Sequence, residues 1–415
     1  MSDSMRGARQ TFIVLRNGQH VKYVVSIPDQ NKVFLSREGQ KDRIPTPVFT
    51  PLPLFYPPTK AIHTQHSLAM IFSLLSFALP TLIHAATVTF PPTVGLGTSD
   101  VQYTSSASSF DSLKIPNVNS TTYEWYYFDA ISDDGSYSVV ATFFVAPDTA
   151  FPFTGSPTMT LEVLLSIQTP DSDVFYLNGE FATNAQVTTD GDGASGVWEG
   201  TGLSFNGSSD MSSYEVVINS ADLMGVTGTI SMQSIAPAHY PCTANEAGVT
   251  MQLMPHVGWA NAIPDSQATV QLEINGQNVS FTGSGYHDMN WGDIPFTDAV
   301  GTWHWGHGRL GPYSLVWFNG TSQDGSPFAS GYISMNGAIL ATQCSGVSVT
   351  ATSSGFDIEI DLADEGVFQA QFSTDHELLS FDGVYFRWSG SLVGGISGDE
   401  QYTGSAMFDE FDFSS

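Results

Sequence analysis

Two short segments set this chain apart: Tyr286-His287-Asp288-Met289-Asn290-Trp291-Gly292 and, after a ten-residue link, Trp303-His304-Trp305-Gly306-His307-Gly308-Arg309. They hold three of the eight tryptophans and three of the ten histidines. Side chains alternate between the two faces of a strand, so Trp303, Trp305, His307 and Arg309 would share one face. Aromatic walls beside an imidazole and a fixed cation are typical of a pocket for an organic ligand.

The same alternation continues on both sides of these segments and predicts an all-β chain. Short runs of alternating apolar residues, separated by Asn-Gly and Asp-Gly pairs that favour hairpin turns, occupy residues 137–145, 161–167, 214–218, 269–274, 356–362 and 367–372. Proline and glycine interrupt the pattern between residues 254 and 267. We therefore expect two β-domains, 87–260 and 265–415, built as sandwiches or barrels, with a small-molecule site in the cleft between them or in a barrel mouth.

The charge is distributed unevenly along the chain. Nine of the twelve Lys and Arg residues lie at or before Lys60, whereas the chain from residue 86 onward carries 37 acidic side chains and only Lys114, Arg309 and Arg387 as cations. Such an acidic surface repels phosphate backbones and anionic lipids, which argues against nucleic-acid and peripheral membrane partners. An arginine kept within an aromatic strand of such a chain is either a ligand contact or half of a buried ion pair.

The first 86 residues have a different composition. Residues 70–86 combine an apolar run, a proline and the small residues Ala85 and Ala86, which is typical of a secretory signal peptide cleaved near its end. Because a signal normally begins a chain, one hypothesis is that translation starts at Met70 and that residues 1–69 are an extension introduced by the gene model. The alternative is a signal anchor that holds the basic first 60 residues in the cytosol.

Other features agree with the secretory pathway. Four Asn-x-Ser/Thr sequons follow the signal, at Asn119, Asn206, Asn278 and Asn319. The two cysteines, Cys242 and Cys344, would pair in an oxidising compartment, and two free buried thiols are the alternative. We therefore expect a secreted glycoprotein with one disulfide and no stable membrane insertion after signal cleavage.

A carboxylate lies within the aromatic strand Glu124-Trp125-Tyr126-Tyr127-Phe128-Asp129. Desolvation among aromatic rings would raise the pKa of Glu124 and allow the side chain to act as an acid near neutral pH. The structural alternative is a carboxylate bonded to backbone amides.

In the segment 286–292, Asp288 shares a face with Tyr286 and Asn290, whereas His287 shares the other face with Met289 and Trp291. Asp288 is a candidate general acid or a residue that orients a histidine. A turn-forming role for Asp288 and Asn290 is the structural alternative.

Metal and nucleophile signatures are weak. His304 and His307 would point to opposite faces of a strand, and no carboxylate has obvious ligand spacing. The sequence contains no Gly-x-Ser-x-Gly nucleophile motif. We therefore expect a mechanism without metal or organic cofactor, and the pattern makes no prediction about oligomeric state.

The three motifs Glu124-Trp125-Tyr126-Tyr127, Tyr286 to Gly292 and Trp303-His304-Trp305-Gly306 resemble the lipocalin-like carotenoid 1,2-hydratases (hydroxyneurosporene synthases). The fungal branch of this family includes kievitone hydratase-like proteins and Diels–Alderases. The resemblance covers roughly residues 95–410 and implies an N-terminal β-sandwich joined to a C-terminal lipocalin-like β-barrel, with the substrate between them. Met289 stands where the hydratase pattern Asp-His-x-Trp-Gly has histidine, which favours cyclisation over hydration.

The resemblance, together with a secretory signal, implies a pericyclase for a small hydrophobic polyketide or terpenoid. We expect a stereoselective (4+2) hetero-Diels–Alder cycloaddition in fungal secondary metabolism, such as the coupling of a tropolone quinone methide with humulene, because this chemistry mainly requires placement of the reactants. His307 or Arg309 would hydrogen-bond the heterodiene carbonyl. The full set of catalytic candidates is Glu124, His287, Asp288, His307 and Arg309, and the substrate-binding candidates are Trp125, Tyr127, Tyr286, Trp291, Trp303, Trp305 and Trp317.

Two other functions remain open at this point. A hydratase would add water to a prenyl or terpene double bond. A lipocalin-like carrier would bind the same kind of molecule without turnover, so that changes at Arg309 or Glu124 would alter only affinity.

Overall fold

The computed structural model describes residues 9–16, 19–26, 85–170, 176–381 and 383–414. The chain forms two compact units, Met1–Thr81 and Leu82–Ser415. In the first unit, β1 (Arg9–Arg16) and β2 (Gln19–Ser26) pair as an antiparallel hairpin. The expected signal peptide and its cleavage site lie almost entirely outside the described residues. Within the described residues, no helix is long and apolar enough to cross a membrane.

The second unit begins with a 13-stranded antiparallel sheet, here called the first sheet. Its strands in chain order are β3 (Ala86–Phe90), β4 (Tyr123–Ser132), β5 (Ser138–Val145), β6 (Leu161–Gln168), β7 (Tyr176–Phe181), β8 (Asn184–Asp190), β9 (Gly193–Glu199), β10 (Leu203–Gly207), β11 (Ser213–Ser220), β12 (Val226–Ser234), β13 (Gln252–Met254), β14 (Val257–Ile274) and β15 (Gln277–Gly292). Across the sheet they run in the order β3-β8-β9-β10-β11-β12-β14-β15-β4-β5-β6-β7, with β13 attached to β14.

The first sheet curls so that its two halves enclose one hydrophobic core, as a sandwich does. Trp198 on β9 reaches across this core, and its indole N–H donates to the backbone carbonyl of Phe144 on β5 at 3.0 Å. The ring of Phe205 on β10 packs against the rings of Tyr126 and Phe128 on β4. Stacking the two halves buries the apolar face that each half would otherwise expose to water.

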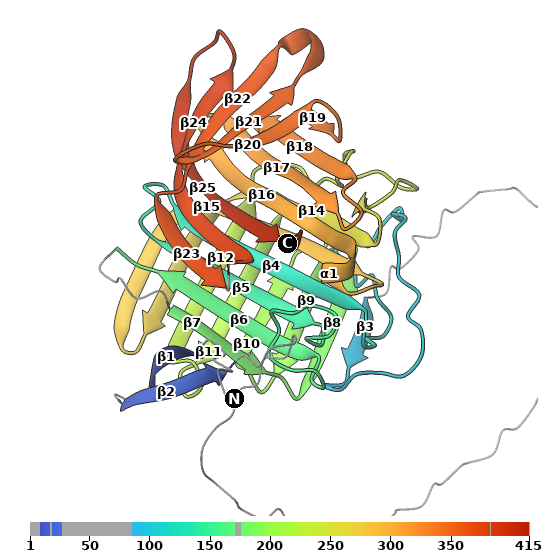
Figure 1. Ribbon diagram of the computed structural model, residues 1–415, viewed down its shortest axis with the longest axis vertical. Coiled ribbons are helices and arrows are strands. Elements are labelled where there is room, and N and C mark those ends of the chain that lie inside the picture. Colours follow the sequence, from blue (N-terminus) through green and yellow to red (C-terminus); the bar gives the residue numbers. More distant parts are fainter. Residues whose placement is uncertain (1–8, 17–18, 27–84, 171–175, 382, 415) are drawn as a thin grey trace, which may run out of the picture. The chain divides into compact units, whose positions relative to one another are not determined.

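The remaining strands form a ten-stranded sheet that closes almost completely into a barrel (Figure 1, orange to red). They are β16 (Val300–Leu310), β17 (Tyr313–Ser322), β18 (Pro327–Met335), β19 (Ala338–Gln343), β20 (Val347–Ala351), β21 (Gly355–Asp361), β22 (Val367–Ser373), β23 (His376–Phe381), β24 (Tyr385–Ile396) and β25 (Tyr402–Asp412). A short helix, α1 (Phe296–Ala299), precedes the barrel, and a 3-10 turn, η1 (Ala363–Glu365), joins β21 to β22.

The predicted all-β fold, with a sandwich followed by a lipocalin-like barrel, is confirmed. Each strand expected from alternation overlaps a strand of the structure. Asn275-Gly276 and Asn336-Gly337 form the two-residue turns of the β14–β15 and β18–β19 hairpins, and all four residues have positive φ. Asparagine and glycine tolerate this left-handed backbone, which explains why these pairs mark the turns.

The change from the first sheet to the barrel falls after Gly292, later than the boundary expected between residues 260 and 265. Pro264 lies inside β14, where the pairing with β15 shifts register between Ile263 and Ser266. The irregularity accommodates a residue without an amide hydrogen in an otherwise continuous strand. In the sequence, a proline at a bulge interrupts the strand pattern in the same way as a domain boundary, which explains the misplaced boundary.

Strand β16 separates two cores. Trp303 and Trp305 face the first sheet, whereas Gly306 and Gly308 face the barrel interior. A Cβ atom at Gly306 would come within 2.3 Å of the ring of Trp317, so this position needs glycine to make room for the indole. Trp317 belongs to the barrel core, and its expected role in substrate binding is wrong because its strand, β17, directs this ring inward.

The first sheet and the barrel are joined by an aromatic layer and by several cross-links. Arg309 of β16 binds Asp265 of β14, and the hydroxyl of Ser405 donates to the carbonyl of Ser132. Cys242 and Cys344 form a disulfide that connects the segment after β12 with the segment after β19. These links fix the barrel against one face of the first sheet.

We predict that replacing both cysteines, Cys242→Ser with Cys344→Ser, lowers the free energy of unfolding. The bond closes a loop with a sequence separation of 102 residues, and the chain-entropy model assigns such a loop about 4 to 5 kcal/mol. Urea unfolding followed by tryptophan fluorescence measures the change, with the oxidised and the reduced wild-type protein as controls. Equal stability of the double variant and the oxidised wild type would contradict the prediction.

Candidate functional site

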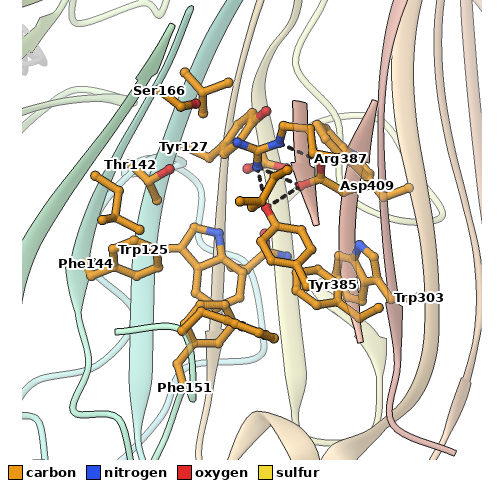
Figure 2. Close-up of a pocket in the computed structure, with 18 of the residues that line it drawn as sticks. Trp125, Tyr127, Thr142, Phe144, Phe151, Ser166, Trp303, Tyr385, Arg387 and Asp409 are labelled. Atoms are coloured by element: carbon orange, nitrogen blue, oxygen red, sulfur yellow. Dashed lines mark hydrogen bonds and ion pairs between the residues drawn. The ribbon is translucent and has the colours of Figure 1, made fainter. Parts of the chain in front are cut away.

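A cleft of about 730 Å³, including space that is open to solvent, lies between the first sheet and the barrel. Figure 2 shows its aromatic walls and its polar end. The lining residues come from five strands of the first sheet, from the segment between β5 and β6, and from four strands of the barrel: Trp125, Tyr127, Val140, Thr142, Phe144, Phe151, Phe153, Leu164, Ser166, Leu177, Asp288, Asn290, Trp303, Trp305, Leu379, Tyr385, Arg387, Asp409 and Phe411.

The pairing of β4 with β15 builds the wall from the first sheet. Asp288 is paired with Tyr127, and Asn290 with Trp125. Opposite residues of neighbouring strands point to the same face, so two aromatic rings, a carboxyl group and an amide enter the cleft together. Phe151, from the segment between β5 and β6, packs on Trp125 with ring centroids 4.6 Å apart. These residues make a rigid wall that is mostly apolar.

The barrel supplies the opposite wall from strands far away in the sequence. Trp303 and Trp305 come from β16, Arg387 from β24 and Asp409 from β25. Strand β25 pairs with both β16 and β24, and Arg387 and Asp409 are register partners. The three strands therefore bring two indoles and an ion pair to the same face of the barrel.

Asp288 is the acidic group of the first-sheet wall, and it is only 3% exposed. Its Oδ2 atom accepts hydrogen bonds from the indole N–H of Trp259 and from the hydroxyl of Tyr286, both at 2.7 Å. Burial raises the pKa of Asp288 to about 7, and these two hydrogen bonds limit the increase. The Oδ1 atom takes part in neither bond, so a proton on Oδ1 would be available to a molecule in the cleft.

The hydroxyl of Tyr286 lies between two acceptors, Oδ2 of Asp288 and Oδ1 of Asn261. A hydroxyl has one hydrogen and can donate to only one of them at a time. Donation to Asp288 favours its carboxylate form. The alternative, donation to Asn261, becomes favourable when Asp288 is protonated on Oδ2. Tyr286 can therefore adjust to both protonation states of Asp288 without moving.

Arg387 and Asp409 form the polar end of the cleft (Figure 2). The guanidinium donates from Nε and Nη2 to the two carboxylate oxygens of Asp409, each at 2.7 Å. Nη2 also donates to the hydroxyl of Tyr385, which donates in turn to Asp409 at 3.1 Å. Burial lowers the pKa of Arg387, but the negative charge of Asp409 outweighs this effect, so the pKa stays well above its usual value. The group remains cationic at any physiological pH.

Five of the residues expected at the site from the sequence line this cleft: Trp125, Tyr127, Asp288, Trp303 and Trp305. A sixth, Tyr286, does not line the cleft, but its hydroxyl donates to Asp288 and its ring packs against Trp305. The alternation of side chains in residues 124–129, 286–292 and 303–309 predicted which of these residues share a face of their strand.

Glu124 and His287 are corrections, because they face the interior of the first sheet and not the cleft. Glu124 accepts hydrogen bonds from the backbone amides of Lys114 and Ile115, which is the structural role considered as the alternative. Burial raises the pKa of Glu124 to about 8. His287 is fully buried and contacts Asp111 through Nε2 at 3.0 Å. Neither side chain can reach a molecule bound between the sheet and the barrel.

Trp291 shares that interior face with His287 and is also a correction. It is fully buried in the core of the first sheet, and its indole N–H donates to the carbonyl of Gln102 at 2.8 Å. Its role is to hold the segment before β4 against β15.

Arg309 and His307 face the first sheet, but they do not line the cleft, which corrects their expected contact with substrate. Arg309 donates to both carboxylate oxygens of Asp265, and Ser314 donates to the same carboxylate. His307 contacts Asp129 through Nε2 at 2.8 Å and stacks on Tyr286. Both residues therefore join the two layers of the unit.

Arg387, Asp409 and Tyr385 line the cleft, although no sequence motif indicates them. The rarity of arginine could have pointed to Arg387 as a functional residue, because it is one of only two arginines after residue 60. No sequence feature distinguishes Asp409, since it is one of many acidic residues. Their proximity depends on the pairing of β24 with β25, which local sequence patterns do not reveal.

The predicted glycosylation sites have different environments. Asn206 and Asn278 are exposed on β10 and β15. Asn119 is half-buried, and its side-chain amide donates to the carbonyl of Gly97 and accepts from the amides of Thr121 and Thr122. Asn319, on β17, is also half-buried. The first two positions are the more accessible to a glycosyltransferase.

The described part of the chain contains no group of three or more His, Cys, Asp or Glu side chains that could hold a metal ion. The cleft itself presents one carboxyl group titrating near neutrality, one guanidinium–carboxylate pair, the hydroxyls of two tyrosines, a threonine and a serine, one side-chain amide and a set of aromatic faces. Such a set can bind a flat organic molecule, exclude water from it and move one proton.

The fold is shared with solved structures, among them CghA and kievitone hydratase. CghA, solved in complex with Sch210972, aligns with a TM-score of 0.64 over 79% of this chain and 98% of its own, at 16% identity. Kievitone hydratase from Nectria haematococca aligns with a TM-score of 0.50 over 79% and 99% of the two chains, at 14% identity. At these identities the likeness shows the fold alone.

Sequence relatives and a family model establish the family. The chain is 34% identical to the quinolone epoxide rearrangement protein asqO of Emericella nidulans, over 79% of this chain and 93% of that protein. It is 26% identical to the Diels-Alderase poxQ of Penicillium oxalicum, over 71% and 66% of the two chains. The model of the Diels-Alderase-like family matches residues 94–357, which include β4 and β15 and the first five strands of the barrel. The resemblance to the fungal Diels-Alderase branch of the lipocalin-like proteins is thereby confirmed, and the chain belongs to the Diels-Alderase-like family.

Proposed function

We propose that the protein catalyses an acid-assisted rearrangement of an epoxide in a small aromatic secondary metabolite. The observation that carries this proposal is Asp288, a buried carboxyl group with a pKa of about 7 in an aromatic cleft. A general acid works best when its pKa lies near the working pH, because it is then both protonated and able to give up its proton. The 34% identity to a quinolone epoxide rearrangement protein supports the same reaction class.

The reaction needs one proton, which is returned at the end. The Asp288 carboxyl donates a proton to the epoxide oxygen, and a carbon–oxygen bond of the ring breaks. A neighbouring group then migrates with its bonding electrons to the electron-poor carbon. The hydroxyl oxygen forms a carbonyl group and returns its proton to the Asp288 carboxylate. The product is an isomer of the substrate, so no oxidant, reductant or cofactor is consumed.

The aromatic walls suit the cationic character of this transition state. The faces of tryptophan and tyrosine attract positive charge, and the attraction is stronger when water is excluded. Trp125, Tyr127 and Trp305 line the cleft beside or opposite Asp288 and are nearly buried. They would stabilise the developing charge and keep water from trapping the electron-poor carbon.

A stereoselective (4+2) hetero-Diels–Alder cycloaddition, such as that of a tropolone quinone methide with humulene, is the second candidate. The relatives named Diels-Alderases and the breadth of the aromatic surface favour it. The cleft would hold diene and alkene in a reactive pose, and Asp288 would assist the dehydration that unmasks the quinone methide. A hydratase or a non-catalytic carrier of polyketides or terpenoids remains a further alternative.

The masses of the products distinguish between these candidate functions. Purified protein is incubated with quinolin-2-ones that bear an epoxide side chain and, separately, with a quinone-methide precursor and humulene. Rearrangement gives an isomer of unchanged mass, hydration adds one molecule of water and incorporates heavy oxygen from labelled water, and cycloaddition joins two reactants with increased enantiopurity. Binding without any product would indicate a carrier.

We predict that Asp288→Asn reduces the rearrangement rate by about a hundredfold or more, because an amide cannot donate the proton. The initial rate of isomer formation, measured by liquid chromatography, tests this expectation. Asp222→Asn, at an exposed aspartate, is the matched control and should retain full activity. Wild-type rates in a correctly folded Asp288→Asn variant would remove the proposed acid role.

A second prediction concerns pH. Activity should fall as the pH rises through about 7, since the acid form of Asp288 is then lost. The hydrogen bond from Tyr286 stabilises the carboxylate, so Tyr286→Phe should raise the pKa of Asp288 and move this fall in activity to higher pH. The rate is measured between pH 5 and 9, with Tyr402→Phe as a control. An unchanged pH profile in Tyr286→Phe would contradict the coupling.

We also propose that the protein enters the secretory pathway, with residues 70–86 as its signal peptide. The Cys242–Cys344 disulfide and the exposed sequons at Asn206 and Asn278 support this proposal. Protein secreted by its native fungal host should begin near Ala85 or Ala86 and lose mass on treatment with a peptide-N-glycosidase. A chain that begins near Met1 would exclude cleavage of the signal.

A further inference from the structure

One nitrogen of the Arg387 guanidinium, on the wall of the cleft, has no recorded hydrogen bond. A guanidinium has five N–H donors, and the recorded hydrogen bonds of Arg387 start from Nε and Nη2. Nη1 takes part in none of them. Because the side chain is 7% exposed and lines the cleft, water has little access to this group. A free donor on a largely buried side chain favours any ligand that brings an acceptor atom.

A second unused donor lies close to the first. The Cζ atom of Arg387 is 5.2 Å from the centre of the Tyr127 ring, and Figure 2 shows the ring beside the guanidinium. The Tyr127 hydroxyl is buried and has no hydrogen-bond partner. Burial raises the pKa of Tyr127 well above its usual value, so the hydroxyl keeps its proton and can donate it. Two unused donors therefore belong to neighbouring residues that both line the cleft.

The charges around these donors exclude an anion as their partner. Asp409 balances the charge of Arg387 through two hydrogen bonds, so the pair has no net charge. Asp288, on the same cleft, adds either no charge or one negative charge. A carboxylate or phosphate would have to give up its hydration and would meet no unpaired cation in return. A carbonyl oxygen loses much less on desolvation and can accept hydrogen bonds from both donors.

We propose that Arg387 Nη1 and the Tyr127 hydroxyl form an anchor for an uncharged carbonyl oxygen, such as that of a lactam or cyclic ketone, carried on a flat aromatic substrate. The inference rests on the proposed function, since it names the substrate class of the same cleft. Tyr127 and Asp288 are register partners on β4 and β15, so their Cα atoms are about 5 Å apart. Both side chains start from neighbouring positions on the same wall of the cleft, so one small molecule can meet both.

Three probes of similar size test the anchor: quinolin-2(1H)-one, a neutral lactam; naphthalene, which has no polar acceptor; and 2-naphthoate, an anion. Equilibrium dialysis gives the affinity of each probe for the full chain. We expect the lactam to bind at least about tenfold more tightly than the other two, because two buried hydrogen bonds contribute this much. Equal affinity for the lactam and naphthalene, or a preference for 2-naphthoate, would overturn the proposal.

Two variants assign the preference to the anchor. Tyr127→Phe removes only the hydroxyl and should weaken lactam binding about threefold to tenfold while naphthalene binding is kept. Tyr402→Phe removes a hydroxyl that bonds Glu400 on the surface, and it is the matched control. The double variant Arg387→Met with Asp409→Leu removes the ion pair without leaving a buried charge, and it should abolish the preference for the lactam. An undiminished preference in correctly folded Tyr127→Phe would overturn the role of the hydroxyl.

Asp288→Asn separates this inference from the proposed reaction. The variant should lose turnover of the epoxide substrate but keep its preference for quinolin-2(1H)-one over naphthalene. If Asp288→Asn remains fully active while the anchor variants lose the preference, the acid mechanism fails and the anchor stands. If Asp288→Asn is inactive while the wild type shows no lactam preference, the acid mechanism stands and the anchor fails.

Discussion

The structure depends on the alternation of side chains along β4 and β15, two neighbouring strands that each belong to two cores. One face of this pair, with Tyr126, Phe128 and Met289, fills the interior of the first sheet. The opposite face, with Trp125, Tyr127 and Tyr286, packs against the barrel. A shift of one residue in either strand would exchange these faces and place charged groups in the wrong core. The same constraint that holds the two layers together therefore positions Asp288 in the cleft.

The two arginines after residue 60 show how one residue type serves two purposes. Arg309 is bonded to Asp265 and to the carbonyl of Ser266, with Ser314 completing the group, and it joins the first sheet to the barrel. Arg387 is bonded to Asp409 at the cleft, with one terminal nitrogen left over. The difference lies in what surrounds each pair: Arg309 is partly exposed to solvent and does not line the cleft, whereas Arg387 is nearly buried and lines it. An acidic chain that keeps so few cations uses one for architecture and presents the other to the cleft.

Much of the candidate site was predictable because β-strand geometry is local. Alternation alone placed Trp303 and Trp305 on one face of β16, and Asp288 on the face opposite His287. The same reasoning could not tell which face would meet the cleft. Glu124 and His287 were therefore assigned to a site, although they point into a sandwich core that only forms when β9 to β11 fold over β4. Trp317 was misplaced for the same reason, since its neighbour Gly306 makes room for the indole inside the barrel.

The sequence by itself determined the all-β fold, the hairpin turns at Asn275-Gly276 and Asn336-Gly337, the acidic surface and the family, because periodicity, turn chemistry and motif spacing are properties of short segments. Only the tertiary structure decided that Arg387 and Asp409 meet Tyr127 across a cleft. It also decided that Asp288 is buried deeply enough for its pKa to rise to about 7. Both facts arise from the packing of strands more than 100 residues apart. Desolvation and cross-sheet contact depend on what covers a residue, and no local pattern records that.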